Sequence, residues 1–214
     1  MAEFKTVSLA DQVFERLEND IITGVYAKGE VLTELRLVEQ LGVSRTPIRE
    51  ALRRLEQERL IEDTGKGSLV LGITLQDLED IMDIRLRVEP LAAYYAAVNI
   101  TAEGIENLRQ ISELQDFYYA KEDVERLRQM DDRFHEAIYA LCGRAVLKDT
   151  LRPLHRKTQR YRKSSITSRE RQADSIQEHK ALLDAICAKD AAAAEKLSRE
   201  HISHAKENMI ARYR

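Results

Sequence analysis

Two side chains on one stretch of the sequence have the spacing of metal ligands on a helix. Asp131 and His135 are four residues apart, so on a helix they point the same way and can hold one metal ion. Such a site needs further nitrogen ligands, and His179 and His201 can supply them from their own amphipathic segments. Buried structural histidines that hydrogen-bond to carboxylates show the same spacing, and spacing alone favours that second interpretation.

The two remaining histidines are interpreted differently. His204 follows His201 by three residues, so helical periodicity does not separate the two as candidate ligands. His155 stands among basic residues, and we expect it to face solvent.

Arg45 and Arg49 form a second candidate site, because residues four apart share a helix face. Thr46 lies beside them and Arg53 one turn further along. Guanidinium groups and the free N-H groups of a helix N-terminus bind phosphate oxygens and the O6/N7 edge of guanine. The alternative is a solvated helix face whose charge the neighbouring glutamates balance. The type of the surrounding elements distinguishes the two interpretations.

The first of these elements is an amphipathic helix. Apolar residues recur every four positions from Leu9 to Ile21, after a capping signal at Ser8 and Asp11. Gly24 ends the pattern, which predicts one helix between these points.

A short second helix is predicted between Thr33, a capping residue, and Gly42, a left-handed stop. We expect its apolar side to consist of Leu35, Val38 and Leu41.

A third helix follows after a very short turn. Ser44 can cap it, and Pro47 lies in the first turn, where its missing N-H has no cost. Two helices joined by so tight a turn are typical of a helix-turn-helix, whose second helix reads DNA. The predicted buried stripe of this helix is Ile48, Leu52 and Leu55.

Residues 60–71 alternate around a glycine-rich turn and predict a two-stranded hairpin, the wing. Beyond Gly72 the pattern becomes helical. The sequence therefore predicts a mainly α protein with two domains, a winged helix-turn-helix over 1–72 and a helical domain over 73–214.

Helical periodicity continues through the second domain. The segment from Arg156 to Arg171 is rich in Arg, Lys and Ser, and we interpret it as a solvated helix end and loop. About six helices are expected, near 75–98, 102–119, 122–142, 145–163, 171–188 and 190–212.

Composition limits the function classes. The net charge is -3, and the first 72 residues hold ten Lys and Arg against thirteen Asp and Glu, so any DNA site must be a local patch. No apolar run approaches the roughly 20 residues of a membrane helix, and the first residues lack a secretory signal, so we expect a cytoplasmic protein. Cys142 and Cys187 are too few and too far apart for a disulfide framework.

The run from Gly42 to Leu52, with the Gly65-Lys66-Gly67 wing, resembles the GntR family of bacterial regulators. Family members often carry an arginine on the second helix at the position of Leu35, so the adjacent Arg36 is named as a backbone contact. The resemblance implies that the wing tip, with Lys66 and Gly67, enters the minor groove. It further implies base contacts from Arg45 and Arg49 and phosphate contacts from Thr46 and Ser44, and Arg53 completes the predicted set.

The segment from Asp131 to Ile138, with Glu178-His179 and the pattern leading to His201, resembles the FCD domain of the FadR-like subgroup. Residues 85–93 resemble the opening helix of that domain. The resemblance implies an antiparallel helical bundle around a cavity with a divalent metal. It assigns the ligands Asp131, His135, His179 and His201, which selects His201 over His204.

One carboxylate and three imidazoles suit Zn, Ni or another first-row divalent ion and leave the complex cationic. With two coordination positions open, a small organic acid such as a 2-hydroxycarboxylate could complete the shell. Arg85 could pair with this effector, or equally with Glu89, four residues on.

The sequence therefore predicts a homodimeric transcription regulator, a repressor released from its double-stranded operator by a small organic acid at a metal site. In one alternative the metal ion itself is the signal. A metal-dependent enzyme is the other, but we find no further acid-base pair dedicated to such a site and expect no enzymatic activity.

Overall fold

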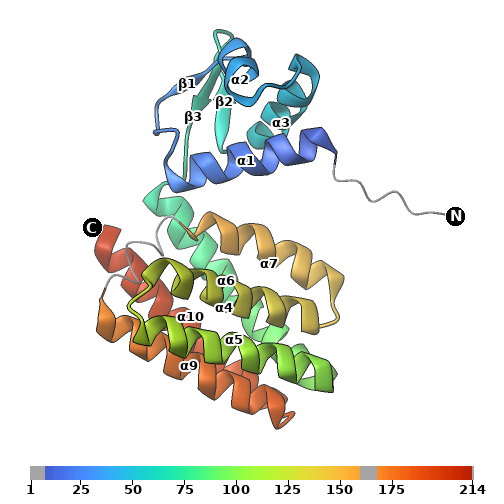
Figure 1. Ribbon diagram of the computed structural model, residues 1–214, viewed down its shortest axis with the longest axis vertical. Coiled ribbons are helices and arrows are strands. Elements are labelled where there is room, and N and C mark those ends of the chain that lie inside the picture. The colour runs from blue at the N-terminus through green and yellow to red at the C-terminus, as the bar shows by residue number, and fades with distance from the viewer. Residues whose placement is uncertain (1–7, 160–167, 214) are drawn as a thin grey trace, which may run out of the picture. The chain divides into compact units, whose positions relative to one another are not determined.

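The computed structural model describes residues 8–159 and 168–213. The chain divides into two compact units, residues 1–74 and 75–214, whose elements Figure 1 labels. The helical content and the small sheet confirm the predicted mainly α fold, a winged helix-turn-helix followed by a helical unit.

The first unit begins with α1 (Leu9–Thr23), as its apolar spacing predicts. The Ser8 hydroxyl accepts from the Asp11 backbone N-H while the Asp11 carboxylate accepts from the Ser8 backbone N-H, which completes a capping box. At the other end Gly24 takes a left-handed φ of 81°.

Helices α2 (Glu34–Leu41) and α3 (Arg45–Gln57) form the helix-turn-helix. Gly42 closes α2 in the left-handed region with a φ of 66°, a conformation that favours glycine. Two details of the prediction are wrong. The Ser44 side chain makes no capping hydrogen bond, and the buried leucine of α2 is Leu37, whereas Leu35 is 58% exposed.

The wing is a three-stranded antiparallel sheet in the order β1-β3-β2, formed by Val31–Leu32, Ser68–Val70 and Ile61–Asp63. The sequence predicts β2 and β3 but not β1, because a strand of two residues has no periodicity to detect. Gly67 directly precedes β3, where β1 leaves no room for a side chain. A Cβ on Gly67 would stand 2.8 Å from the Leu32 carbonyl oxygen, and its φ of +147° is one that side chains rarely adopt.

The core of the first unit joins α1, α3 and the sheet. Leu17, Ile48 and Leu55 are fully buried in it, and Leu32 and Ile61 add the sheet side. Burial of this kind fixes α3 against α1, so the opposite face of α3 is held outward.

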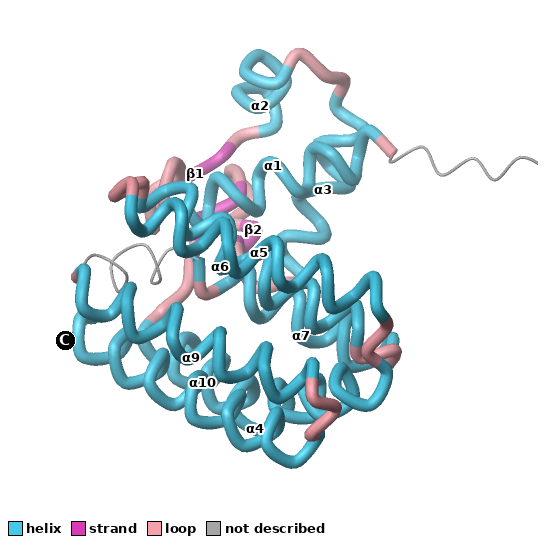
Figure 2. The backbone as a smooth tube through the Cα atoms, turned by 60° about the horizontal axis from the view of Figure 1, so that its bottom comes forward, coloured by secondary structure: helices cyan, strands magenta, loops and turns pink. Residues whose placement is uncertain are grey.

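The described part of the second unit consists of helices joined by short loops (Figure 2). Five of them begin and end within two residues of the predicted limits. Helix α7 begins as predicted but ends at Lys157, and residues 160–163 of that prediction lie outside the described residues. The helices are α4 (Leu75–Asn99), α5 (Ala102–Ala120), α6 (Val124–Leu141), α7 (Ala145–Lys157), α9 (Arg169–Cys187) and α10 (Ala191–Tyr213).

Helix α4 packs against α6, α7, α9 and α10. Small side chains at its buried positions, among them Ala92, Ala93, Ala96 and Ala97, allow these helices to approach closely. Arg85 and Glu89 are buried on the same helix, an unusual place for charged groups. Within residues 8–159 and 168–213, no helix has the combination of length and apolar character that membrane crossing requires.

Candidate functional site

Three helices of the second unit bring three histidines together. His135 comes from α6, His179 from α9 and His201 from α10, and each is at most 4% exposed. One ring nitrogen of each lies within 4.8 Å of the others, so the three can share one metal ion. We call these residues the histidine cluster.

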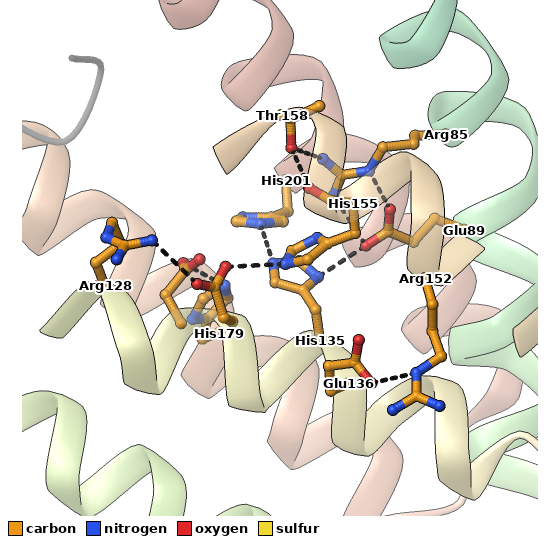
Figure 3. Close-up of polar contacts among 12 residues, drawn as sticks. Arg85, Glu89, Arg128, His135, Glu136, Arg152, His155, Thr158, His179 and His201 are labelled. Atoms are coloured by element: carbon orange, nitrogen blue, oxygen red, sulfur yellow. Dashed lines mark hydrogen bonds and ion pairs between the residues drawn. The ribbon is translucent and has the colours of Figure 1, made fainter. Parts of the chain in front are cut away.

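Two rings of the histidine cluster face each other through their Nε2 atoms, which are 3.3 Å apart (Figure 3). Their outer nitrogens contact carboxylates, His135 Nδ1 at 2.7 Å from Glu89 and His201 Nδ1 at 2.6 Å from Glu178. Because a carboxylate only accepts, this geometry favours the tautomer with the proton on Nδ1 in both rings, in which the two Nε2 lone pairs face each other. A separation of 3.3 Å also fits two ligands about 2.0–2.1 Å from a shared ion, so these residues fit a divalent metal.

His179, on α9, is the third member of the histidine cluster. Its Nε2 lies 3.6 Å from Asp131 Oδ1, and its ring stacks on Phe134 with centroids 4.3 Å apart. Gln115 contacts the outer nitrogen at 3.0 Å. The structure thus brings the buried Asp131 next to the histidine cluster, as a fourth candidate ligand at its edge.

The prediction that His155 faces solvent is wrong. His155 is 1% exposed. Its Nε2 lies 3.1 Å from Asp132 Oδ1, and its ring centroid is 4.9 Å from that of His135. His155 and Leu151 are four residues apart and form the buried side of α7, while the basic residues nearby occupy its other faces. That apolar spacing was the available signal, and the basic neighbours concealed it.

His204 lies outside the histidine cluster. Its side chain is 52% exposed and its Nδ1 donates to Glu178 Oε1 at 2.8 Å, on the outer side of His201. The structure therefore places His201, and not His204, among the buried rings.

Arg85 forms an ion pair with Glu89, which was one of the two predictions for this residue. Its Nε donates to Glu89 Oε2 at 2.8 Å and its Nη2 to Glu89 Oε1 at 3.3 Å, and the residue is 2% exposed. Nη1 turns to Thr158 Oγ1 at 3.2 Å. Burial by itself raises the pKa of Glu89, but Arg85 and His135 outweigh it and hold that pKa well below its usual range.

Two rings of the histidine cluster, those of His135 and His201, are neutral at pH 7. Burial lowers the pKa of His201 to about 4 and also lowers that of His135. Burial would raise the pKa of Glu178, yet hydrogen bonds from His201 and Arg171 bring it to about 2. Neutral imidazoles with ionised carboxylates behind them are the form in which histidine binds metal.

The candidate DNA face lies in the first unit. Arg45, Thr46, Arg49 and Arg53 are exposed on α3, as their spacing predicts. A groove of about 500 Å³ separates this helix from the wing, and its lining includes Arg49, Arg53, Lys66 and Gly67.

Two acidic residues on this face, Glu30 and Glu34, are not predicted by the sequence as partners of the arginines. Glu34 accepts from Arg49 Nε at 2.7 Å, and Glu30 accepts from Arg36 Nη1 at 2.6 Å. The Arg49 guanidinium lowers the pKa of Glu34, so this carboxylate is ionised at neutral pH. Glu34 is fifteen residues from Arg49, a separation at which helical spacing predicts nothing.

A winged helix-turn-helix with an exposed basic reading helix, followed by a helical unit with a buried histidine cluster, defines a DNA-binding transcription regulator with an attached sensing domain. The sequence matches "Bacterial regulatory proteins, gntR family" over residues 9–70 and the FCD domain over residues 80–204. The chain therefore belongs to the GntR family of bacterial regulators and carries an FCD domain, which confirms the resemblance noted above.

Relatives of known sequence and structure agree. The chain is 28% identical over 196 residues to the uncharacterized HTH-type transcriptional regulator YdhC of Bacillus subtilis, covering 90% of this chain and 87% of that one. It is 29% identical to the HTH-type transcriptional repressor GlaR of Escherichia coli, covering 87% and 89%. The solved structure of E. coli McbR/YncC superposes with a TM-score of 0.83 at 25% identity, over 98% of this chain and 100% of that one.

The buried Arg85–Glu89 pair yields a stability prediction. Arg85→Met leaves the Glu89 carboxylate buried without its cation, so the free energy of unfolding of chelator-treated protein should fall by about 3–5 kcal/mol. Arg171→Met is the matched control. Its partner Glu178 is 18% exposed and should tolerate the loss better. Urea unfolding measures both, and an Arg85→Met protein as stable as the wild type, or less affected than Arg171→Met, would contradict the assignment.

Proposed function

We propose that this regulator is a cytoplasmic homodimer that represses transcription and is released from its operator by a small organic acid bound at a metal site. The observation that carries the proposal is the pair of Nε2 atoms 3.3 Å apart in the histidine cluster. With both protons on Nδ1, the two Nε2 lone pairs repel each other, and a bound cation would replace this repulsion by two metal-nitrogen bonds.

Asp131, His135, His179 and His201 would hold the ion, and nitrogen-rich ligands of this kind suit Zn or Ni. The ion would supply a buried positive charge at which an anion binds. One carboxylate among four ligands leaves that charge only partly compensated, which favours an organic acid as effector.

The space beside the histidine cluster bears on how the acid enters. A cavity of about 10 Å³ lies there, and room for one water needs a comparable volume. An acid would therefore have to displace side chains, and this requirement would couple its binding to a rearrangement of the bundle. The lining includes Gln115, Arg128, Asp131, Gln172, Ser175 and His179.

Arg85 remains proposed as an effector contact. Because Nε and Nη2 are held by Glu89, the contact would be made through Nη1, which now meets Thr158. A carboxylate that reached Nη1 would compete with the Thr158 hydroxyl at the end of α7.

The proposed DNA contacts follow from exposure and from the groove beside α3. Arg45 and Arg49 would read base edges in the major groove, and Arg49 would first leave Glu34, a weak solvent-exposed pairing. The wing residues Lys66 and Gly67 would reach the minor groove. Phosphate contacts are assigned to Ser44, Thr46, Arg36 and Arg53.

An apolar stripe on α4 supports the homodimer. Ile84, Leu91 and Val98 recur every seven residues and are 41–52% exposed. Val146 on the adjacent α7 is 79% exposed. A second copy of the chain would cover this stripe in a two-fold arrangement, and two reading helices would then meet two operator half-sites.

The metal-responsive alternative keeps one supporting observation, the small volume of the cavity. If no acid fits, the ion itself would be the signal. We propose that the protein has no enzymatic activity.

The DNA assignment predicts different outcomes for two substitutions at one position. With the preferred duplex first selected from a random pool by the wild type, Arg49→Ala should lose about 1–3 kcal/mol of discrimination between that duplex and a scrambled one. Arg49→Lys keeps the charge but not the bidentate fork, so it should lose discrimination while its salt dependence stays near that of the wild type. Fluorescence anisotropy measures both, and unchanged discrimination in Arg49→Ala would refute the base contact.

The sensing assignment predicts a metal-dependent ligand effect. In a panel of organic acids, the effector at about 100 times its dissociation constant should add about 2.7 kcal/mol of stability and raise the unfolding midpoint by several degrees. Chelator treatment or His179→Ala should abolish this shift, because the acid would lose its cation. A shift that survives both treatments would rule out a metal-assisted site, and no shift with any acid despite bound metal would favour metal sensing.

A further inference from the structure

The outer nitrogens of two rings in the histidine cluster meet similar arrangements of charge. His135 Nδ1 contacts Glu89, which is paired with Arg85. His201 Nδ1 contacts Glu178, which is paired with Arg171. Each arrangement is an arginine, a glutamate and a histidine in a row, and we call the two of them the Arg-Glu-His relays.

The second relay has tight geometry. Arg171 donates Nη1 to Glu178 Oε1 at 2.7 Å and Nη2 to Glu178 Oε2 at 3.0 Å, a two-point contact that fixes the plane of the carboxylate. The same Oε2 lies 2.6 Å from His201 Nδ1. The arginine thus orients the carboxylate and the carboxylate orients the ring.

The outer nitrogen of the third ring, that of His179, contacts an amide. Both amide atoms of Gln115 are near His179 Nδ1, the nitrogen at 3.0 Å and the oxygen at 3.3 Å. An amide can donate or accept, so it does not dictate which ring nitrogen carries the proton. At their outer nitrogens, His135 and His201 therefore meet an obligate acceptor, whereas His179 meets an amide.

We propose that Glu89 and Glu178 are positioning residues for the metal site, which hold the proton of His135 and His201 on Nδ1 and so aim both Nε2 lone pairs at one point. This inference rests on the proposed metal function. It adds that the site is set before the ion arrives, because neither ring has to change tautomer or turn. The ion meets two nitrogens already 3.3 Å apart.

The relay at Glu178 is the better one to test, because Glu178 is 18% exposed and Glu89 is 3% exposed. Glu178→Gln keeps the size of the side chain but replaces an obligate acceptor by an amide. His204→Ala is the matched control. It removes the other imidazole that contacts Glu178 and leaves the relay to His201 intact.

The experiment has two readouts on the full-length chain. In metal-free protein labelled with 15N at histidine, two-bond 15N-1H correlation spectra report the tautomer of each ring. Zn²⁺ affinity is then measured by competition with a chromophoric chelator.

We expect the Nδ1-H tautomer for His135 and His201 in the wild type. Glu178→Gln should shift His201 toward the Nε2-H form and weaken Zn²⁺ binding about 10- to 100-fold. His204→Ala should stay within about two-fold of the wild type on the same scale. If Glu178→Gln does not fold, Arg171→Lys, which loosens the carboxylate from behind, should give the same changes at smaller size.

The outcomes distinguish a failure of the relay from a failure of the metal function. A wild type that binds Zn²⁺ with His201 in the Nε2-H form, or a folded Glu178→Gln protein with unchanged Zn²⁺ affinity, would overturn the relay and leave the metal function standing. A wild type that binds neither Zn²⁺ nor Ni²⁺ would overturn the metal function and the relay with it.

Discussion

A buried imidazole needs partners for both of its nitrogens, and the sensing unit is organised around that requirement. A buried polar group without a partner costs about 1–3 kcal/mol. Glu89 and Glu178 satisfy the outer nitrogens of two rings, and buried carboxylates in turn need cations, which Arg85 and Arg171 provide. Each arginine thus supports the histidine cluster through a glutamate. The Nε2 atoms of His135 and His201 are left to face a common point.

The DNA-binding unit applies the same principle at its surface, with a different consequence. Its excess of acidic residues looks unfavourable for DNA binding, yet Glu34 and Glu30 pair with the arginines of the helix-turn-helix instead of forming a separate acidic patch. Because both pairs are at least partly open to solvent, they are weak and easily exchanged for phosphates or base edges. The sign of the total charge therefore says little about this face.

Sequence patterns predict the parts of this protein that depend on local physics. Capping residues and apolar spacing predict the helix limits, and the i,i+4 spacing of Asp131 and His135 places them on one buried side of α6. Spacing does not reveal contacts between distant segments. Glu178 and Gln115 therefore remain hidden as partners of histidine, and so does the burial of His155 against α6. Strand β1 escapes prediction for a related reason, because pairing with β3, and not its own two residues, defines it.

The most direct test of the account measures operator affinity as a function of the organic acid in metal-loaded and metal-stripped protein. The acid should weaken binding of the selected duplex by about 5- to 150-fold in the metal-loaded protein, the usual range of coupling between two sites. Metal-stripped protein should bind the duplex with an affinity that the acid leaves unchanged. Equal release by the acid with and without metal would contradict the claim that the histidine cluster carries the signal.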